Sequence, residues 1–284
     1  MKKRNRSFNN RRPLLPLFAI LLILAGCSGN NEPKAGDGAG APAKAAASAS
    51  SSRLDEIRAK GKLVIATGDY YPFEFIDAET QELIGYDVDL GRKIAEKLGV
   101  EAEWKTMQFS AIIPTVQNGQ ADMAIAALYI TEERKQIVEM SDVYLETSLS
   151  LVKRGDNDSI NGIEDLNGKK VGVKIGSTSE KTAKELLEKG YDFELLSYKE
   201  TADVLLELTL GRVDAVLNDY LNQLGYNKQH PDANLVIVGD SLMEAGLGIA
   251  LRKGDTELLE LVNEVIKAWR ESGEGQQAFE KWLG

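Results

Sequence analysis

The sequence predicts an α/β protein with two lobes, and three observations support this fold class. Short apolar runs that are typical of buried strands alternate with longer segments whose apolar residues recur at helical spacing. Strands that are separated by helices of about 10–15 residues are typical of mainly parallel sheets. The alternating pattern occurs twice along the 284 residues, and this length suffices for two modest domains.

The first set of elements begins near residue 53. It is expected to contain a strand at 63–67, helices at 88–98 and 111–117, and a buried strand from 121 to 127. Gly99 ends the helix at 88–98, because glycine readily adopts the backbone conformation of a helix C-terminus. Asp87 and Asp89 are expected to cap the start of this helix and to favour its dipole, rather than to contact a ligand or act as catalytic acids.

The second set begins near residue 149. Its expected strands are 171–174, 193–196, 213–217, 235–238 and 247–251, and its expected helices are 180–189, 202–210 and 219–228. Two helices, 258–271 and 276–282, close the chain. The recurrence of the pattern therefore predicts a second α/β lobe.

The stretch 121–134 combines a buried strand with a helix start. Thr131, Glu132 and Glu133 provide a hydroxyl cap and acidic side chains for the first helical turn. Arg134 therefore lies one turn into a short helix just past a strand end, where its planar guanidinium is suited to bind a carboxylate. The alternative is a surface arginine that pairs with Glu132 or Glu133.

Composition and charge exclude several classes of function. The formal net charge is −10, and residues 1–26 carry six basic residues and no acidic one, so removing them leaves a charge of −16. So acidic a body repels phosphate, and nucleic acid is not expected as a partner. The single cysteine, Cys27, and the single histidine, His230, permit no intramolecular disulfide and no Cys/His metal site. No metal and no cofactor are expected, and His230 is expected in a solvated loop.

Residues 1–26 have the pattern of a targeting segment. A basic stretch precedes the apolar residues 14–24, which are fewer than the ~20 residues of a membrane-spanning helix. Leu-Ala-Gly-Cys at 24–27 resembles the lipobox of a bacterial lipoprotein signal, which implies cleavage before Cys27 and lipid on its sulfur. The alternative is a plain secretory signal. Residues 27–52 lack large apolar side chains, so we expect a flexible tether.

Four segments occur in an order and at spacings that are typical of one family. They are Thr-Gly-Asp-Tyr-Tyr-Pro-Phe-Glu-Phe at 67–75, Gly-Tyr-Asp-Val-Asp-Leu at 85–90, Phe-Ser-Ala-Ile-Ile-Pro at 109–114 with the stretch 121–134, and Gly-Ser-Thr-Ser-Glu at 176–180 with Asp-Ala-Val-Leu-Asn-Asp at 214–219. In these segments the chain resembles the extracellular solute-binding proteins of amino-acid ABC transporters, the family 3 group. The resemblance implies a type II periplasmic-binding-protein fold, in which two α/β lobes with mixed, mainly parallel sheets are joined by a hinge of two crossing strands.

The resemblance covers residues 53–284 and implies how they divide into lobes. Residues 53–147 and 243–284 are expected to form the first lobe, and residues 148–242 the second. The two crossing strands are expected near 147–151 and 239–242. A ligand is expected to bind between the lobes and to be enclosed when they close.

The resemblance assigns the two charged groups of an amino-acid ligand to residues of different lobes. Arg134 matches the position that holds the carboxylate. Ser177 and Thr178 lie on the turn before a helix, where backbone N–H groups suit an anion, although either residue also fits a helix cap. Asp219 matches the acceptor of the ligand ammonium, and a helix cap is its alternative role. Each buried charge of the ligand would then have a partner.

Further residues are implied around the ligand side chain. Tyr70 and Phe109 match positions that pack against it, with core packing as the alternative for each. Thr67 matches a position that often contacts the far end of the ligand. Asp69 lies two positions further along and is expected to replace Thr67 in part.

Two positions depart from the family pattern. Tyr129 stands five positions before Arg134, where Ser or Thr is usual, and Ala127 stands seven before, where Ser or Gly is common. A hydroxyl that helps to hold the ammonium is therefore missing or replaced by a phenol. Ala127 still offers its backbone carbonyl, and Tyr129 either fills the cleft or stacks on the ligand.

The resemblance implies a lipid-anchored binding protein of an ABC importer, which captures an amino acid or a related small zwitterion and delivers it to a membrane permease. We expect a monomer in the cell envelope, outside the cytoplasm and held at a bacterial membrane through Cys27. One alternative is an enzyme, because residues 53–57 and 67–70 also resemble cyclohexadienyl dehydratases, which act on prephenate or arogenate. The resemblance places the glutamate acid of those enzymes at Asn222, which is no proton donor, so enzyme activity is not expected. A third alternative is a sensor domain that signals through a separate chain.

Overall fold

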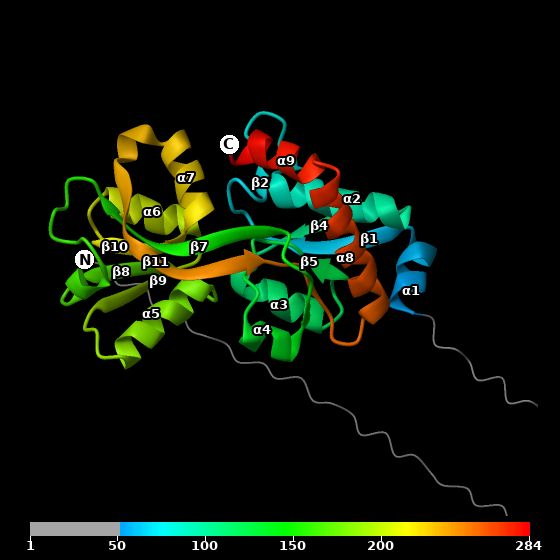
Figure 1. The fold of residues 1–284 in the computed structure, drawn as a ribbon, viewed down its shortest axis with the longest axis horizontal. Coiled ribbons are helices and arrows are strands. Elements are labelled where there is room, and N and C mark those ends of the chain that lie inside the picture. Colours follow the sequence, from blue (N-terminus) through cyan, green and yellow to red (C-terminus); the bar gives the residue numbers. More distant parts are fainter. Residues whose placement is uncertain (1–51) are drawn as a thin grey trace, which may run out of the picture. The chain divides into compact units, whose positions relative to one another are not determined.

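Two five-stranded sheets organise residues 52–284, the part of the chain that the computed structural model describes (Figure 1). The expected signal, most of the tether and Cys27 lie outside the described residues. Each sheet belongs to one lobe and has helices packed against it. The two-lobed α/β fold is therefore confirmed. Each sheet has two parallel and two antiparallel pairings, so the sheets are mixed rather than mainly parallel.

The first sheet has the strand order β4-β1-β5-β12-β6. Its strands are β1 (Lys62–Thr67), β4 (Glu101–Thr106), β5 (Met123–Ala124), β6 (Glu139–Met140) and β12 (Ala250–Leu251). The first lobe also contains α1 (Arg53–Lys60), α2 (Tyr86–Leu98), α3 (Phe109–Gln117), α4 (Glu132–Ile137), α8 (Thr256–Glu271), α9 (Glu274–Trp282) and the hairpin of β2 (Phe75–Ile76) and β3 (Leu83–Ile84). β1 is buried along most of its length and pairs in parallel with β4 and β5.

The second sheet has the strand order β11-β7-β10-β8-β9. Its strands are β7 (Leu145–Arg154), β8 (Lys170–Lys174), β9 (Glu194–Tyr198), β10 (Ala215–Asp219) and β11 (Leu235–Leu247). The helices of this lobe are α5 (Thr178–Glu188), α6 (Thr201–Thr209) and α7 (Tyr220–Gln229), with short 3-10 turns η1 (Ile163–Leu166) and η2 (Pro231–Ala233). β10 is buried throughout, including its polar last residues Asn218 and Asp219.

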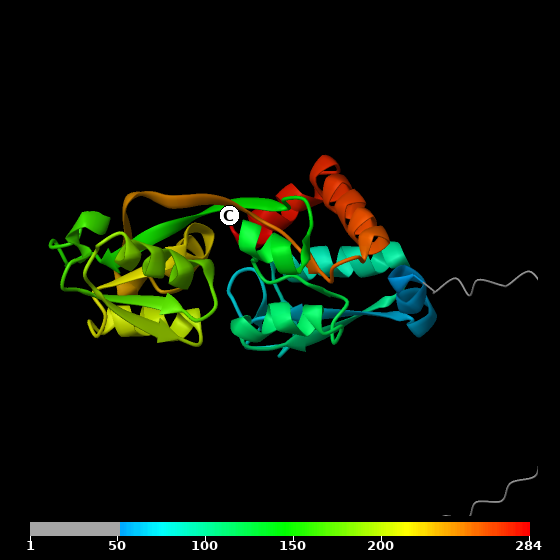
Figure 2. The ribbon, with the colours of Figure 1, turned by 90° about the horizontal axis from the view of Figure 1, so that it is seen from below.

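The long strands β7 and β11 run from one lobe to the other (Figures 1 and 2). They pair antiparallel, and the pairing is irregular between Val238 and Met243. The expected hinge of two crossing strands is therefore present. Among residues 52–284, none of the helices combines the length and apolar character that crossing a membrane requires.

Asp87 and Asp89 lie in the first turn of α2 but do not cap it. The N-cap residue is Gly85, and no side chain caps the helix. Asp87 is fully buried and accepts hydrogen bonds from the backbone N–H of Ala127 at 2.7 Å and from the Tyr144 hydroxyl at 2.9 Å. Asp89 accepts a hydrogen bond from a tryptophan ring of α9. The capping prediction was therefore wrong, because both carboxylates accept hydrogen bonds from residues outside α2 instead of from its first turn.

Candidate functional site

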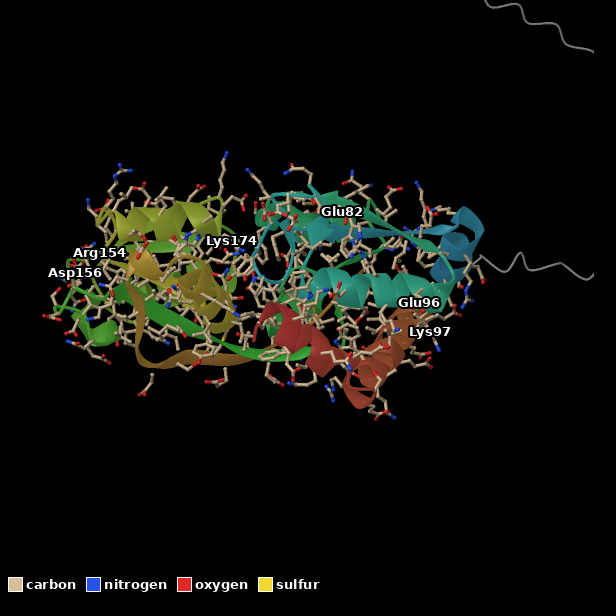
Figure 3. The ribbon with its side chains drawn as sticks, turned by 90° about the horizontal axis from the view of Figure 1, so that it is seen from above. Glu82, Glu96, Lys97, Arg154, Asp156 and Lys174 are labelled. Carbon is tan, nitrogen blue, oxygen red and sulfur yellow. The ribbon has the colours of Figure 1, made fainter. Side chains whose placement is uncertain are left out.

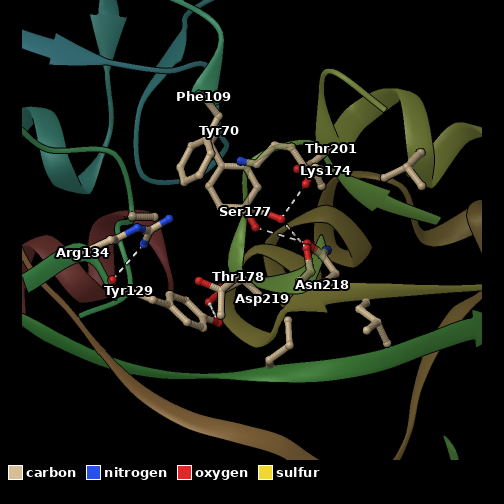
Figure 4. Close-up of a pocket in the computed structure, with 15 residues that line it drawn as sticks. Tyr70, Phe109, Tyr129, Arg134, Lys174, Ser177, Thr178, Thr201, Asn218 and Asp219 are labelled. Carbon is tan, nitrogen blue, oxygen red and sulfur yellow. Dashed lines mark hydrogen bonds between the residues drawn. The ribbon is translucent and has the colours of Figure 1, made fainter. Parts of the chain in front are cut away.

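A small cavity lies between the lobes, where the ends of β8 and β10 face the starts of α3 and α4 (Figure 4). Its volume is about 40 Å³, and fifteen residues line it. Eight of them are residues that the sequence analysis assigned to the site: Tyr70, Phe109, Ala127, Tyr129, Arg134, Ser177, Thr178 and Asp219. The other seven are Leu149, Lys174, Ser179, Thr201, Val204, Leu217 and Asn218.

Arg134 presents a guanidinium to this cavity without an acidic partner in the described residues. Thr131 caps α4 by accepting the backbone N–H of Arg134 at 3.2 Å, as its sequence position predicted. Arg134 Nη1 donates to the carbonyl of Tyr129 at 2.8 Å. The alternative pairing with neighbouring acids does not occur, because Glu132 pairs with Lys135 and Glu133 with a lysine of α5. Burial lowers the pKa of Arg134 to about 10, and the charge of Glu133 offsets this effect only in part.

The N-terminus of α5 supplies hydrogen-bond donors at the same cavity. Ser177 caps the helix by accepting the backbone N–H of Glu180 at 3.3 Å, which is the capping role left open by the sequence. Thr178 and Ser179 line the cavity, and their backbone N–H groups donate to no acceptor within residues 52–284. Free N–H groups at a helix start attract a carboxylate or another anion.

Asp219 places a buried carboxylate on the other side of the cavity. It caps α7 by accepting the backbone N–H of Asn222 at 2.9 Å, so its alternative role as a cap is also observed. Its second oxygen accepts the hydroxyls of Tyr129 at 2.7 Å and Thr147 at 2.8 Å. Burial raises the pKa of Asp219, although these hydrogen bonds favour the ionised form. A ligand cation would gain from this carboxylate.

Tyr129 and Ala127 shape the cavity at the two positions that depart from the family pattern. The phenol of Tyr129 reaches across from the first lobe to Asp219, and both burial and this carboxylate raise its pKa. Ala127 has a left-handed backbone with φ of 45°, which is uncommon for a residue with a side chain. Asp87 stabilises this turn through the backbone N–H of Ala127, and the Ala127 carbonyl accepts no hydrogen bond within residues 52–284.

Tyr70 and Phe109 lie on either side of Lys174, a residue that the sequence analysis did not select. Lys174 Nζ is 3.9 Å from the centre of the Tyr70 ring and 4.2 Å from that of Phe109. Figure 3 shows Lys174 where the two lobes meet. Its position at the end of a predicted strand was a usable signal, because ligand sites of α/β folds lie at the carboxyl ends of strands.

Thr67 and Asp69 do not line the cavity, contrary to expectation. Thr67 is fully buried, and its hydroxyl donates to the carbonyl of Ile125 at 2.8 Å, so it links β1 to the residue that follows β5. Asp69 instead borders a neighbouring hollow with Glu200 and His230. Within residues 52–284, no group of three or more His, Cys, Asp or Glu side chains is placed to hold a metal ion.

Comparisons with known proteins show which family the chain resembles in sequence and fold. Residues 63–284 match the family described as bacterial extracellular solute-binding proteins, family 3. The arginine-binding extracellular protein ArtP of Bacillus subtilis (strain 168) is 34% identical over 235 residues, which cover 82% of this chain and 90% of that protein. The solved structure of an ancestral arginine-binding protein bound to arginine is 43% identical with a TM-score of 0.75, and the match covers 79% of this chain and 99% of that one.

A third comparison bears on the enzyme alternative. The crystal structure of the ancestral amino acid-binding protein AncCDT-1, a precursor of cyclohexadienyl dehydratase, is 36% identical with a TM-score of 0.75 and covers 82% of this chain and 100% of that one. In the present chain, Asn222 donates to the carbonyl of Tyr71 at 2.6 Å and accepts from Asn218 at 2.7 Å, so its amide only joins structural elements. These three relatives are all named as binding proteins. This chain belongs to the bacterial extracellular solute-binding proteins, family 3.

Proposed function

We propose that this chain is the substrate-binding protein of an ABC importer and captures an amino acid between its lobes. The observation that best supports the proposal is that Arg134 and Asp219 line one small cavity from different lobes. The ligand carboxylate would bind Arg134 and the free N–H groups of Thr178 and Ser179. The ligand ammonium would bind Asp219 and the carbonyl of Ala127. The amino acids in the names of the relatives support this ligand class.

Closure of the lobes would couple ligand capture to delivery. Contacts that join the lobes around the cavity include the Tyr129–Asp219 and Tyr70–Asn218 hydrogen bonds and an ion pair of 3.0 Å between Glu133 and Lys181. A ligand that contacts both lobes favours the closed arrangement, because it makes its full set of contacts only there. A membrane permease would then receive the closed, loaded monomer.

Isothermal titration calorimetry with the standard amino acids tests the proposal. Arg134→Gln is expected to weaken binding at least ~30-fold, because it removes a charge-assisted partner of the carboxylate from a partly buried site. Arg212→Gln is the matched control, since Arg212 is exposed and pairs only with Glu207 away from the cavity. Absence of binding by every amino acid, or equal affinities of Arg134→Gln and the unaltered protein, would contradict the proposed function.

We also propose that Cys27 carries the lipid that holds the protein at a bacterial membrane. The basic and apolar leader that ends in Leu-Ala-Gly-Cys supports this anchor. Mass spectrometry of the protein from the membrane fraction is expected to find an acylated Cys27 at the N-terminus. Cys27→Ser is expected to release the protein from the membrane, and a free thiol at Cys27 in the mature protein would leave the plain secretory signal as the explanation.

A further inference from the structure

Lys174 places a second cation inside the ligand cavity. Its side chain extends from the end of β8 in the second lobe to a position between the Tyr70 and Phe109 rings of the first lobe (Figure 4). Lys174 is only 8% exposed. Within residues 52–284, Lys174 Nζ has no hydrogen bond to an acceptor atom and no ion pair within 4.0 Å. Burial of this ammonium lowers the pKa of Lys174 to about 8.

The charges that line the cavity are unbalanced. Arg134 and Lys174 are cationic, whereas Asp219 is the one acidic residue among the fifteen that line it. Burying charges is costly unless each finds a partner. A neutral zwitterion would bring one carboxylate and one ammonium, which match Arg134 and Asp219 and leave Lys174 without an anion.

The acids behind the lining do not supply that anion directly. Glu74 is fully buried, and burial raises its pKa well above the ordinary value, which favours its protonated form. Glu200 is partly exposed at the edge of the neighbouring hollow. Neither acid forms an ion pair with Lys174 within 4.0 Å, although the charges of both raise its pKa from a greater distance and offset its burial in part. A second carboxylate on the ligand would therefore be the closest partner for this ammonium.

Resting on the proposed function, we infer that Lys174 selects an acidic amino acid by pairing with the carboxylate of its side chain. Binding would proceed as the lobes open, because the cavity is small and the Lys174 side chain occupies the space beside the Tyr70 and Phe109 rings. On closure, the flexible lysine side chain would move from the rings to the ligand carboxylate. A ligand with a cationic side chain, such as the arginine named for two of the relatives, would instead meet a buried like charge.

Calorimetry with glutamate, aspartate, glutamine and arginine tests this inference. The unaltered protein is expected to bind glutamate or aspartate at least roughly 100-fold more tightly than arginine, because like charges at close range in a partly buried site repel strongly. Lys174→Met, which keeps the length and apolar stem of the side chain, is expected to weaken binding of the acidic ligand by ~30-fold or more. Its affinity for glutamine is expected to change far less, because glutamine carries no side-chain charge.

Two further variants separate charge from packing. Lys174→Arg keeps the cation and is expected to keep the preference for acidic ligands. Lys170→Met alters an exposed lysine at the other end of β8 and is expected to change neither affinity. Circular dichroism of each variant establishes that it is folded before its binding is compared.

The outcomes distinguish the inference from the function on which it rests. Tighter binding of arginine than of glutamate and aspartate, with a loss in Arg134→Gln, would overturn the role of Lys174 and leave the proposed function standing. The role of Lys174 would also be overturned, and the proposed function kept, if Lys174→Met and the unaltered protein had the same ratio of acidic-ligand affinity to arginine affinity. Failure of every amino acid to bind would overturn both.

Discussion

The Tyr129 hydroxyl donates a 2.7 Å hydrogen bond to Asp219 Oδ2, and this bond joins the two lobes across the cavity. The Thr147 hydroxyl donates to the same oxygen, and the backbone N–H of Asn222 donates to the other. Protein donors therefore fill most of the acceptor capacity of this carboxylate. A ligand ammonium would use the remaining acceptor position or displace one of these donors, and Tyr129 is the donor that comes from the other lobe.

Tyr129→Phe is expected to favour open lobes in the absence of ligand. A hydrogen bond to a charged group contributes about 1.5–3 kcal/mol, and the substitution removes one that holds the lobes together. Small-angle X-ray scattering is expected to give a larger radius of gyration without ligand and an unchanged radius with saturating ligand. Tyr198→Phe, on the edge strand β9, is the control, because the Tyr198 hydroxyl makes no hydrogen bond to residues 52–284. Equal radii of gyration for Tyr129→Phe, Tyr198→Phe and the unaltered protein, all without ligand, would argue against this role for Tyr129.

Asp219→Asn is expected to abolish most ligand affinity without unfolding the protein. The amide oxygen of asparagine still accepts the backbone N–H of Asn222 and so keeps the cap of α7, whereas the charge that attracts an ammonium is lost. Removal of a buried charge also relieves its desolvation. Calorimetry is expected to show affinity reduced at least ~30-fold, with a melting temperature within a few degrees of the unaltered protein. Asp203→Asn, at an exposed position of α6, is the control and should keep the ligand affinity of the unaltered protein. Wild-type affinity in Asp219→Asn would refute the role of Asp219 as partner of the ligand ammonium.

Several strands could be predicted from the sequence, including the edge strand β9, whereas others were missed or predicted too short. β8 and β10 appear as apolar runs because each is covered by helices. β4 was missed because it is an edge strand whose polar and partly exposed residues lack a clear period. β11 extends past its predicted end, since the polar residues 239–241 interrupt the apolar pattern while the strand continues.

The site could be predicted where one residue and its local element define a role. Arg134 and Asp219 follow predicted strands, and each lines the cavity. Lys174 was missed because its role depends on aromatic rings of the other lobe, about 65 and 104 residues away in the sequence. Thr67 was placed wrongly because the resemblance gives a position but not which way its hydroxyl points, and here the hydroxyl donates to the carbonyl of Ile125.

Glu74 and Asp87 form a buried carboxyl pair behind Ala127. Both residues are fully buried. Asp87 Oδ2 accepts from Ala127 and Tyr144, whereas Asp87 Oδ1 and both oxygens of Glu74 lack a partner within residues 52–284. Burial raises the pKa of Asp87 to about 7 and raises the pKa of Glu74 well above its ordinary value. A proton held between the two carboxyls would satisfy Asp87 Oδ1 and one of the two Glu74 oxygens.

The pair predicts that stability falls as the pH rises through about 7. Both pKa values are raised on folding, so the folded protein keeps protons that the unfolded chain has already lost above about pH 4.5, and alkaline pH removes this advantage. Calorimetric melting temperatures are expected to fall by several degrees between pH 5 and pH 8.5. Glu74→Gln is expected to flatten this fall, because its amide donates to Asp87 at any pH. Parallel profiles for the two proteins would rule out the shared proton.

Gly225 of α7 faces Tyr71 and Pro72 of the first lobe at close range. A Cβ atom at this position would lie 2.8 Å from Tyr71 Cε1 and 3.3 Å from Pro72 Cδ. The Tyr71 ring has little freedom to retreat, because it packs against Phe75 with 4.8 Å between ring centres. Asn222, one turn before Gly225, donates to the Tyr71 carbonyl at 2.6 Å. This contact therefore requires a glycine when the lobes are closed.

Gly225→Ala is expected to weaken ligand binding by hindering lobe closure, without lowering the stability of the fold. Alanine favours a helix interior over glycine by up to ~1 kcal/mol, so the melting temperature without ligand should stay the same or rise. The closed arrangement, in contrast, has to accommodate the new methyl group, and ligand affinity is expected to fall about tenfold. Leu224→Ala, at an exposed position of the same helix, should retain affinity. The double variant Gly225→Ala/Tyr71→Ala should regain it, because the obstructing ring is gone. Wild-type affinity in Gly225→Ala would mean that ligand binding does not need α7 to close against the Tyr71 segment, and a lowered melting temperature would assign the glycine to folding instead.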